Sequence, residues 1–208
     1  MEGKILISSA YLPPAEYFSL IADAEEVLVE KEENYLKQSY RNRCYIISAH
    51  GIQLLSVPVF EGSRRNTPIR DIRIDYSKRW QQVHLGALSA SYSASPYFVF
   101  YFEAIEQIIL KNYNFLLDLN MELAGLICSI MKTGKKLNYT TSFTAVGSKD
   151  NDFRYSLSPK KESSFRPKEY IGVFNSGTVF DPRISIVDLI FNTGPEAAGY
   201  LKNLQFIS

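Results

Sequence analysis

Three features of the chain predict an α+β fold: a strand–helix–strand pattern at the start, a block of short β-branched segments after it, and long apolar stripes at helical spacing in the middle. The expected architecture is a mixed β-sheet with a βαβ-like N-terminal unit, a helical middle segment and C-terminal helices. The chain has 208 residues, of which 46% are hydrophobic and 13% aromatic. This is enough for one buried core, so residues 1–208 are expected to form a single domain.

The first thirty residues read as a strand, a helix and a second strand. Residues 5–7 are short, β-branched and followed by turn residues, which favours a buried strand. Pro14 suits the first turn of a helix, where its missing N–H costs nothing, and apolar residues at helical spacing follow over residues 16–21. Residues 26–30 are again short and apolar at their centre. This order predicts a βαβ-like unit.

A β-rich region follows the opening unit. Residues 44–47 and 52–59 are apolar and rich in β-branched side chains, and His50-Gly51 between them suits a hairpin turn. A further strand is predicted around Ile69, Ile72 and Ile74. The polar stretch before it is expected to be a loop.

The middle of the chain is expected to be helical. Residues 80–92 form one candidate helix, and a second begins after Pro96 with an apolar stripe. Asn114 is a suitable N-cap for a third helix that carries apolar residues as far as Ile130, and Gly134 is well placed to end it. Stripes of this kind predict a packed core.

The C-terminal third alternates polar stretches with short apolar ones. Residues 139–143 and 170–174 are expected to be strands, and the polar stretch 147–167 between them a long loop. Residues 185–192 predict a helix. Pro195 ends it and opens a terminal helix with an acidic first turn.

Net charge and missing motifs narrow the classes of function. A formal net charge of +1 does not favour a nucleic-acid binder, because phosphates require clustered Lys and Arg in excess. The N-terminus lacks the apolar stretch of a signal peptide, and no window has the about twenty apolar residues of a spanning helix. We therefore expect a cytoplasmic protein without membrane insertion. The sequence has no metal-ligand spacing, phosphate loop or dinucleotide fingerprint, so no cofactor is predicted.

Cations and amides are concentrated just before the first strand of the predicted hairpin. Lys37, Asn42 and Arg43 are suited to hold a carboxylate, a phosphate or sugar hydroxyls, because arginine presents a planar fork of donors. The alternative is a solvated approach to the sheet, in which arginines pair with the acidic run at residues 30–33. The residues alone leave both interpretations open.

Two further polar residues lie in apolar surroundings and suit acid–base chemistry. His84 falls on a predicted helix and, because imidazole titrates near neutral pH, it either carries a proton or forms a structural hydrogen bond. Asp188 has apolar neighbours and shares a helix face with Asn192. A carboxylate there either pairs with an arginine, such as Arg43 or Arg79, or serves as an acid or base.

Several blocks of the chain resemble the WbqC-like family. They are Pro13 with residues 16–21, residues 35–37 leading to Asn42-Arg43, Trp80 with His84, residues 95–98, and residues 184–192 ending in Gly194-Pro195-Glu196. The blocks span most of the chain and keep their order. The stretch before Pro13 departs from the family pattern, as does Leu85 after the histidine. If these groups line a pocket, the departures predict a different substrate or none.

The resemblance implies one WbqC-like domain over residues 1–208, linked to bacterial surface-polysaccharide synthesis such as that of lipopolysaccharide O-antigen. It implies His84 and Asp188 as catalytic candidates. The substrate-binding candidates that it implies are Lys37, Asn42, Arg43, Asn192 and Glu196. The implied partner is a small molecule, a sugar or a nucleotide sugar.

Two functions from different classes fit these residues. One is a transferase that acts on an activated sugar. In it, Lys37 and Arg43 hold an anionic group, and His84 or Asp188 is the base. The other is a non-catalytic binding or scaffold protein for polysaccharide enzymes, with the aromatic segment 97–101 as its contact face. A nucleic-acid binder is disfavoured, because aspartates interrupt the basic run of the chain.

Overall fold

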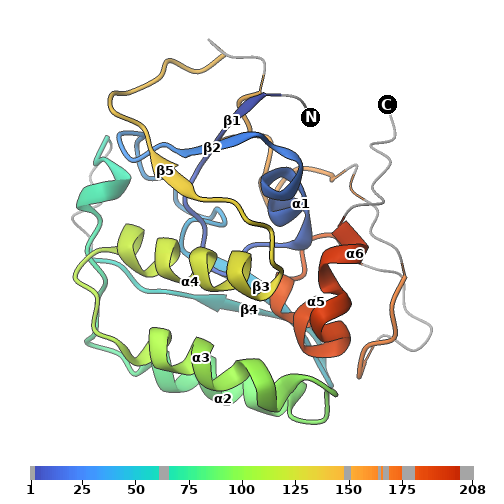
Figure 1. The fold of residues 1–208 in the computed structure, drawn as a ribbon. Coiled ribbons are helices and arrows are strands. Elements are labelled where there is room, and N and C mark those ends of the chain that lie inside the picture. Colours follow the sequence, from blue (N-terminus) through green and yellow to red (C-terminus); the bar gives the residue numbers. More distant parts are fainter. Residues whose placement is uncertain are drawn as a thin grey trace.

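The computed structural model describes residues 3–60, 66–147, 151–163, 165, 169–174 and 181–201. Its strands form two sheets (Figure 1). Strands β1 (Lys4–Ile7), β2 (Glu26–Val29) and β5 (Leu137–Tyr139) are parallel in the order β1-β2-β5, and β3 (Arg43–Ser48) and β4 (Gly51–Ser56) form an antiparallel pair. Parallel and antiparallel strands, together with helices, confirm the predicted α+β class.

The N-terminal βαβ unit is confirmed. β1 and β2 pair in parallel along their full length, and α1 (Ala15–Asp23) connects them. Pro14 occupies the N-cap of α1 with extended backbone, as its fixed φ allows, and the helix then buries Tyr17, Phe18 and Leu20. Because β1, β2 and β5 are parallel, their carboxyl ends share one edge of the sheet.

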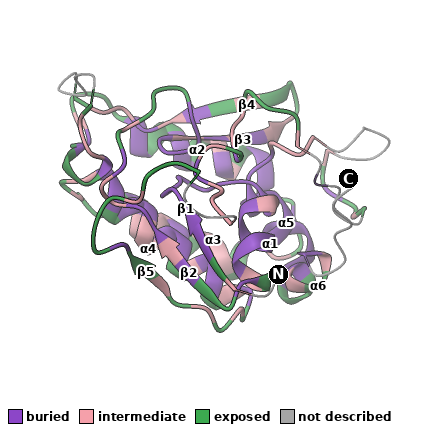
Figure 2. Ribbon diagram, turned by 90° about the horizontal axis from the view of Figure 1, so that it is seen from above, coloured by how far each residue is buried: buried purple, intermediate pink, exposed green. Residues whose placement is uncertain are grey.

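The predicted hairpin is also formed. β3 and β4 are joined by a turn at Ala49-His50, and Gly51 opens β4 with φ +99°, a conformation that favours glycine. Cys44 is buried on the inner face of the hairpin. Figure 2 shows exposed positions along β4, where Leu54 has 45% of its surface accessible. The hairpin therefore has one covered face and one open strand.

Three helices fill the middle of the chain, as predicted. They are α2 (Trp80–Tyr92), α3 (Phe98–Leu110) and α4 (Leu116–Ile130). α2 packs on β3, and α3 packs against both α2 and α4, at the opposite end of the molecule from the parallel sheet (Figure 1). The predicted cap of α4 is wrong: Phe115 is the N-cap residue, with extended backbone, and no side chain caps the helix. Gly134 has φ +69° but lies beyond the end of α4 at Ile130.

Two predicted strands are not formed, and the strand predicted at residues 139–143 is misplaced, because β5 ends at Tyr139. Ile69–Asp71 is a short 3-10 helix, η1, that follows Pro68, and only isolated bridges occur at Arg73 and Ile74. Residues 170–174 are irregular. The isoleucines of the first segment are nevertheless buried in the core. The first error arises because short apolar segments can serve packing without pairing in a sheet. Residues 170–174 differ, because Ile171 is 91% exposed and so has neither sheet nor core to hold it.

The C-terminal elements are α5 (Ile186–Thr193), η2 (Gly194–Glu196) and α6 (Ala197–Leu201). The Ser185 side chain caps α5 by accepting a hydrogen bond from the Val187 N–H. Gly194 has φ +56°, and a Cβ at this position would lie 2.4 Å from the ring of Tyr97. Position 194 therefore requires glycine, both for its backbone and for space.

A buried ionic network lies at the carboxyl ends of β2 and β5. Glu30 directly follows β2, and Thr140, directly after β5, donates its hydroxyl to Glu30 Oε1 at 2.6 Å. Arg154 forms a two-pronged contact with Asp152, at 2.9 and 2.6 Å, and its Nη1 lies 3.5 Å from Glu30 Oε2. Arg154 also donates to the carbonyls of Thr144 and Ala145. This arginine thus fixes the segment after β5 to the end of β2.

Arg41 makes a second fork in the same network. Its Nε and Nη2 donate to Glu33 at 2.9 and 2.6 Å, and Nη2 also reaches the Arg154 carbonyl at 3.4 Å. The side chains of Arg41 and Glu33 are 2% and 0% exposed. Burial raises the pKa of Glu33, and the Arg41 guanidinium opposes that effect. Because buried charges require partners, we assign this network to the stability of the fold.

Candidate functional site

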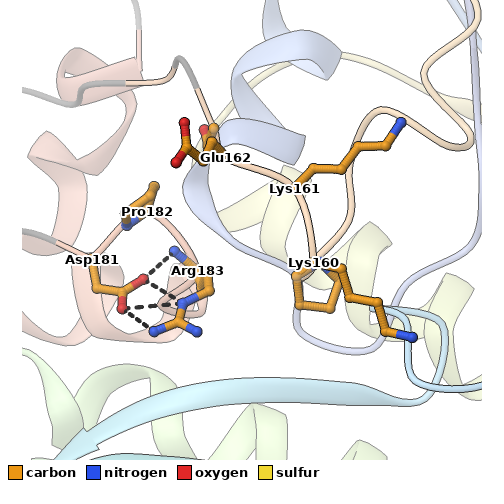
Figure 3. Close-up of a pocket in the computed structure, with 8 residues that line it drawn as sticks. Lys160, Lys161, Glu162, Asp181, Pro182 and Arg183 are labelled. Carbon is orange, nitrogen blue, oxygen red and sulfur yellow. Dashed lines mark hydrogen bonds and ion pairs between the residues drawn. The ribbon is translucent and has the colours of Figure 1, made fainter.

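A cavity of about 500 Å³ opens between two irregular segments, residues 159–163 and 181–183 (Figure 3). We call it the 160–183 pocket. Its lining is Pro159, Lys160, Lys161, Glu162, Ser163, Asp181, Pro182 and Arg183. The volume lies in the ordinary range of small-molecule sites, and six of these eight residues are polar or charged. The pocket is therefore suited to a polar, charged ligand.

One wall of this pocket is an ion pair within a tight turn. Arg183 Nε and Nη2 donate to Asp181 at 3.0 and 2.6 Å, and the Arg183 backbone N–H donates to Asp181 Oδ1 at 2.8 Å. The guanidinium also lies 5.6 Å from the centre of the Tyr45 ring. Burial alone would raise the pKa of Asp181, but the hydrogen bonds and charge of Arg183 lower it. The pair therefore presents an ionised carboxylate beside fixed N–H donors.

The opposite wall supplies two lysines. Lys160 and Lys161 are exposed, and within the described residues neither forms an ion pair. Figure 3 shows both side chains extending away from the Asp181–Arg183 pair. Lysine has a flexible four-carbon stem, so either ammonium group can turn toward an anion in the pocket.

Glu16 adds a carboxyl group with a raised pKa next to this pocket. It lies half-buried in the first turn of α1, and its Oε2 accepts a hydrogen bond of 2.7 Å from Ser163, a residue of the pocket wall. Burial raises the pKa of Glu16, and the Ser163 hydroxyl opposes that effect. Perturbed carboxyl groups beside a cleft are typical of acid–base sites.

These groups complement one another chemically. Lysines neutralise a phosphate or carboxylate, an aspartate–arginine pair accepts from and donates to hydroxyls, and a carboxyl group with a raised pKa exchanges a proton.

Among the described residues, no group of three His, Cys, Asp or Glu side chains is placed to hold a metal ion. In the same part of the chain, no helix is both long and apolar enough to cross a bilayer.

A second cavity, of about 430 Å³, lies between β4 and α2, and we call it the edge pocket. Its lining is Gln53, Leu54, Leu55, Ser56, Pro58, Lys78, Arg79, Trp80, Val83 and His84. The indole Nε1 of Trp80 is buried and has no hydrogen-bond partner in the part of the chain that the structure describes. An unpaired buried donor of this kind is rare in folded proteins.

His84, predicted as a catalytic residue, is buried at the wall of the edge pocket. Its Nδ1 lies 2.8 Å from the hydroxyl of Tyr11, and the ring also hydrogen bonds the backbone of Ser56. Burial lowers the pKa of His84 to about 4, and the Ser56 hydrogen bond opposes that effect. The imidazole is therefore neutral at pH 7 and holds Tyr11 and Ser56 in place.

Three of the predicted residues meet around Ser56. Asn42 Nδ2 donates to Ser56 Oγ at 3.3 Å, Arg43 is paired with Ser56 in the register of β3 and β4, and His84 contacts its backbone. Asn42 Oδ1 and Arg43 Nε are buried without a hydrogen-bond partner among the described residues. With the indole of Trp80, they bring three unpaired polar atoms to the residues that surround one strand end.

Asp188 and Asn192 form a separate cluster on α5. The carboxylate of Asp188 accepts hydrogen bonds from the hydroxyls of Tyr92 and Tyr170, and Asn192 Nδ2 donates to the Asp188 carbonyl at 2.7 Å. Both residues are buried and line neither pocket. The tyrosines supply the partners that a carboxylate in apolar surroundings requires.

Lys37 and Glu196 lie at the surface, outside the lining of both pockets. Of the arginines near the acidic run 30–33, Arg41 pairs with Glu33, as the structural interpretation of that region expects. The chain therefore gathers Asn42, Arg43 and His84 and keeps the other predicted site residues apart from them.

The residues of the 160–183 pocket were not found by sequence reasoning. In the sequence, Glu16 is only part of a predicted helix, and the Asp-Pro-Arg stretch at 181–183 lies outside the predicted site residues. That stretch carries a usable signal, because an aspartate often accepts the backbone N–H two residues later. The contact of Glu16 with Ser163 joins positions 147 residues apart, and no local pattern reveals it.

Comparison with known proteins adds context to both pockets. The WbqC-like protein family matches residues 8–171, which include Glu16 and the whole lining of the edge pocket and end before Asp181. The uncharacterised protein Rv1507c of Mycobacterium tuberculosis (strain ATCC 25618 / H37Rv) is 28% identical to this chain over 228 residues, which cover 97% of the chain and 98% of that protein. No solved structure matches the chain.

Proposed function

Because the chain belongs to the WbqC-like protein family, we propose that it is a cytoplasmic transferase that acts on a sugar or nucleotide sugar in bacterial surface-polysaccharide synthesis. We further propose that residues 1–208 form a single domain. The ligand is proposed to bind in the 160–183 pocket. One observation carries this choice: the hydrogen bond from Ser163 to Glu16 places a carboxyl group of raised pKa beside a pocket with two lysines.

The proposed roles follow from the chemistry of each wall. Lys160 and Lys161 neutralise the phosphate of the ligand, and the Asp181–Arg183 pair binds its hydroxyls. Glu16 accepts a proton from the acceptor hydroxyl or amine, to which the sugar is transferred. A raised pKa favours this role, because a base works best when its pKa is near the operating pH.

The sequence-based roles remain predictions. His84 and Asp188 are the predicted catalytic residues, and the predicted substrate-binding residues are Lys37, Asn42, Arg43, Asn192 and Glu196. Alanine variants of these residues test the predictions through nucleotide-sugar binding and turnover. A role in the reaction requires loss of ligand binding or turnover in a variant whose melting temperature stays close to that of the wild type.

The alternative is a non-catalytic binding or scaffold protein. It is favoured by the start of α3, where Val99 and Phe100 are 73% and 70% exposed. Neighbouring apolar residues that face solvent are typical of surfaces that contact other proteins. A scaffold would bind enzymes of the pathway through this surface and would show no turnover.

Calorimetric titration with a panel of nucleotide sugars tests the proposed site. The double variant Lys160→Ala/Lys161→Ala should weaken binding at least about tenfold, because the phosphate loses its cations. Lys136→Ala is the matched control, since this lysine is exposed and lies outside both pockets. Glu16→Gln should bind normally but turn over about a hundredfold more slowly. Equal affinity of the double variant and the control would contradict the proposed site.

A further inference from the structure

One edge of β4 carries backbone groups that point away from its partner strand. The Val57 N–H donates to the Asn42 carbonyl at 2.8 Å, which fixes the alternation of the antiparallel ladder. Counting from this pair along the register, the N–H and C=O groups of Ile52, Leu54 and Ser56 point away from β3. Within the described residues, no strand pairs with this edge.

Contacts on the far side of β3 agree with this alternation. Tyr45 is the register partner of Leu54, and its carbonyl accepts a hydrogen bond of 2.8 Å from the Ser185 N–H. Ile47, the partner of Ile52, donates its N–H to the hydroxyl of Tyr92 at 3.1 Å. Both groups point away from β4. The opposite groups of Ile52 and Leu54 must therefore face the free edge.

The free edge has a defined end. His84 already bonds the backbone of Ser56, and Pro58 has no N–H to offer. Pairing with an added strand is therefore available at Ile52 and Leu54 and stops at Ser56. The N-terminus of α2 lies at this same end, since His84 is four residues into the helix and the Asp75 N–H bonds the Pro58 carbonyl.

This end of the edge pocket collects positive charge. Lys78 and Arg79 line it, are exposed, and form no ion pair within the described residues. The first turn of α2 adds free backbone N–H groups and the positive end of its dipole. A carboxylate complements all of these groups.

The sides of the edge pocket are apolar. Leu54 from β4 and Val83 from α2 are 45% and 61% exposed, and both line the cavity. Side chains on a strand alternate, so an added strand would direct every second side chain into this cavity. Its volume of about 430 Å³ leaves room for an aliphatic side chain.

We propose that the edge pocket binds the C-terminal end of an extended peptide from a partner protein. The peptide adds to β4 as a parallel strand, through backbone hydrogen bonds at Ile52 and Leu54. Its terminal carboxylate lies at the Ser56 end, against Lys78 and Arg79. This site is separate from the 160–183 pocket, so it gives the protein a partner besides its proposed sugar ligand.

An array of hexapeptides with free C-termini, varied in their last and third-last residues, tests the proposal on the full chain. A subset with aliphatic residues at these positions should bind. Amidation of the C-terminus should weaken these peptides at least about tenfold, because it removes the charge. Amidated peptides with an internal acidic side chain form a second arm. Binding that is unaffected by amidation, or restored by the acidic side chain alone, would overturn the proposed terminal carboxylate.

One pair of changes separates backbone pairing from side-chain contact. Leu54→Pro removes the outward N–H and leaves the ladder to β3 intact, since proline is tolerated on edge strands, whereas Leu54→Ala keeps the N–H and serves as its control. Leu54→Pro should weaken binding at least about tenfold more than Leu54→Ala. Equal binding by the two Leu54 variants would overturn the pairing. N-methylated peptides apply the same test without changing the protein.

Discussion

Arg154 and Arg183 each form a two-pronged ion pair with an aspartate two residues earlier in the chain, but one pair is buried and the other is open to solvent. In both, the backbone N–H of the arginine also donates to the aspartate Oδ1. The Arg154 side chain is 0% exposed, and the Arg183 side chain is 42% exposed. The same local motif therefore occurs in two different environments.

The two arginines differ in what surrounds their remaining donors. Arg154 donates these N–H groups to Glu30 and to two carbonyls of the segment after β5, so its guanidinium serves only the fold. Within the described residues, the side chain of Arg183 donates only to Asp181. The open pair retains N–H groups for a ligand. Burial thus distinguishes the structural Arg154 pair from the Arg183 pair, which is available for binding.

The largest expected effect comes from removing the buried arginine. Arg154→Ala leaves Glu30 and Asp152 buried without their cation, so the free energy of unfolding should fall by about 3–5 kcal/mol. Arg183→Ala, the matched change at the open pair, should cost about 1 kcal/mol or less, because solvent screens it. Urea unfolding measures both values. A similar loss in the two variants would contradict the distinction between the two forks.

His84 provides a second, pH-dependent test of burial. Its folded pKa of about 4 lies below the ordinary value of 6.5, so the folded state favours the neutral ring. The resulting stability is present above pH 6.5 and is lost as the pH falls toward 4, by about 3 kcal/mol in total. Urea unfolding between these pH values measures the loss, and His84→Gln should remove most of it.

The exposed histidine supplies the control for this experiment. His50→Gln changes the hairpin turn, where the side chain lies in solvent. The difference between the two variants then isolates the buried ring. A pH dependence that survives in His84→Gln but disappears in His50→Gln would show that burial of His84 is not its source.

Local patterns predicted much of the fold, because its elements follow from local chemistry. α2 was predicted with the observed bounds, since an apolar face and flanking residues define it within the segment itself. The strand predicted around Ile69 is not formed, because burial of isoleucines does not require a strand and Pro68 precedes a tight turn. Local periodicity thus identifies helices more securely than short buried segments.

The candidate site was less accessible to sequence reasoning. An Asp-x-Arg motif is visible in the sequence at both 152–154 and 181–183, but its environment is not. Arg154 contacts Glu30, which lies 124 positions away in the chain. Contacts over such separations arise from the packing of the segment after β5 over the strand ends. They decide which fork is structural, and no local pattern encodes them.

The smallest expected effect concerns the wall of the open pocket. Ser163 donates to Glu16 and lowers a pKa that burial has raised, so Ser163→Ala should raise the pKa of Glu16 further. A raised folded pKa gives stability that is present below the unfolded pKa and is lost as the pH rises through the folded value. The variant should therefore lose slightly more stability on that rise, by about 1 kcal/mol or less.

Carbon-13 NMR titration of labelled glutamate carboxyls measures this shift, with Glu16→Gln to assign the signal. Ser156→Ala is the control, because this serine lies exposed just before the segment 159–163 and bonds only the Phe153 carbonyl among the described residues. An unchanged Glu16 pKa in Ser163→Ala would mean that the segment 159–163 does not contact α1 in solution. The Asp181–Arg183 pair would then have no acid–base group beside it, and the 160–183 pocket would remain a site for binding alone.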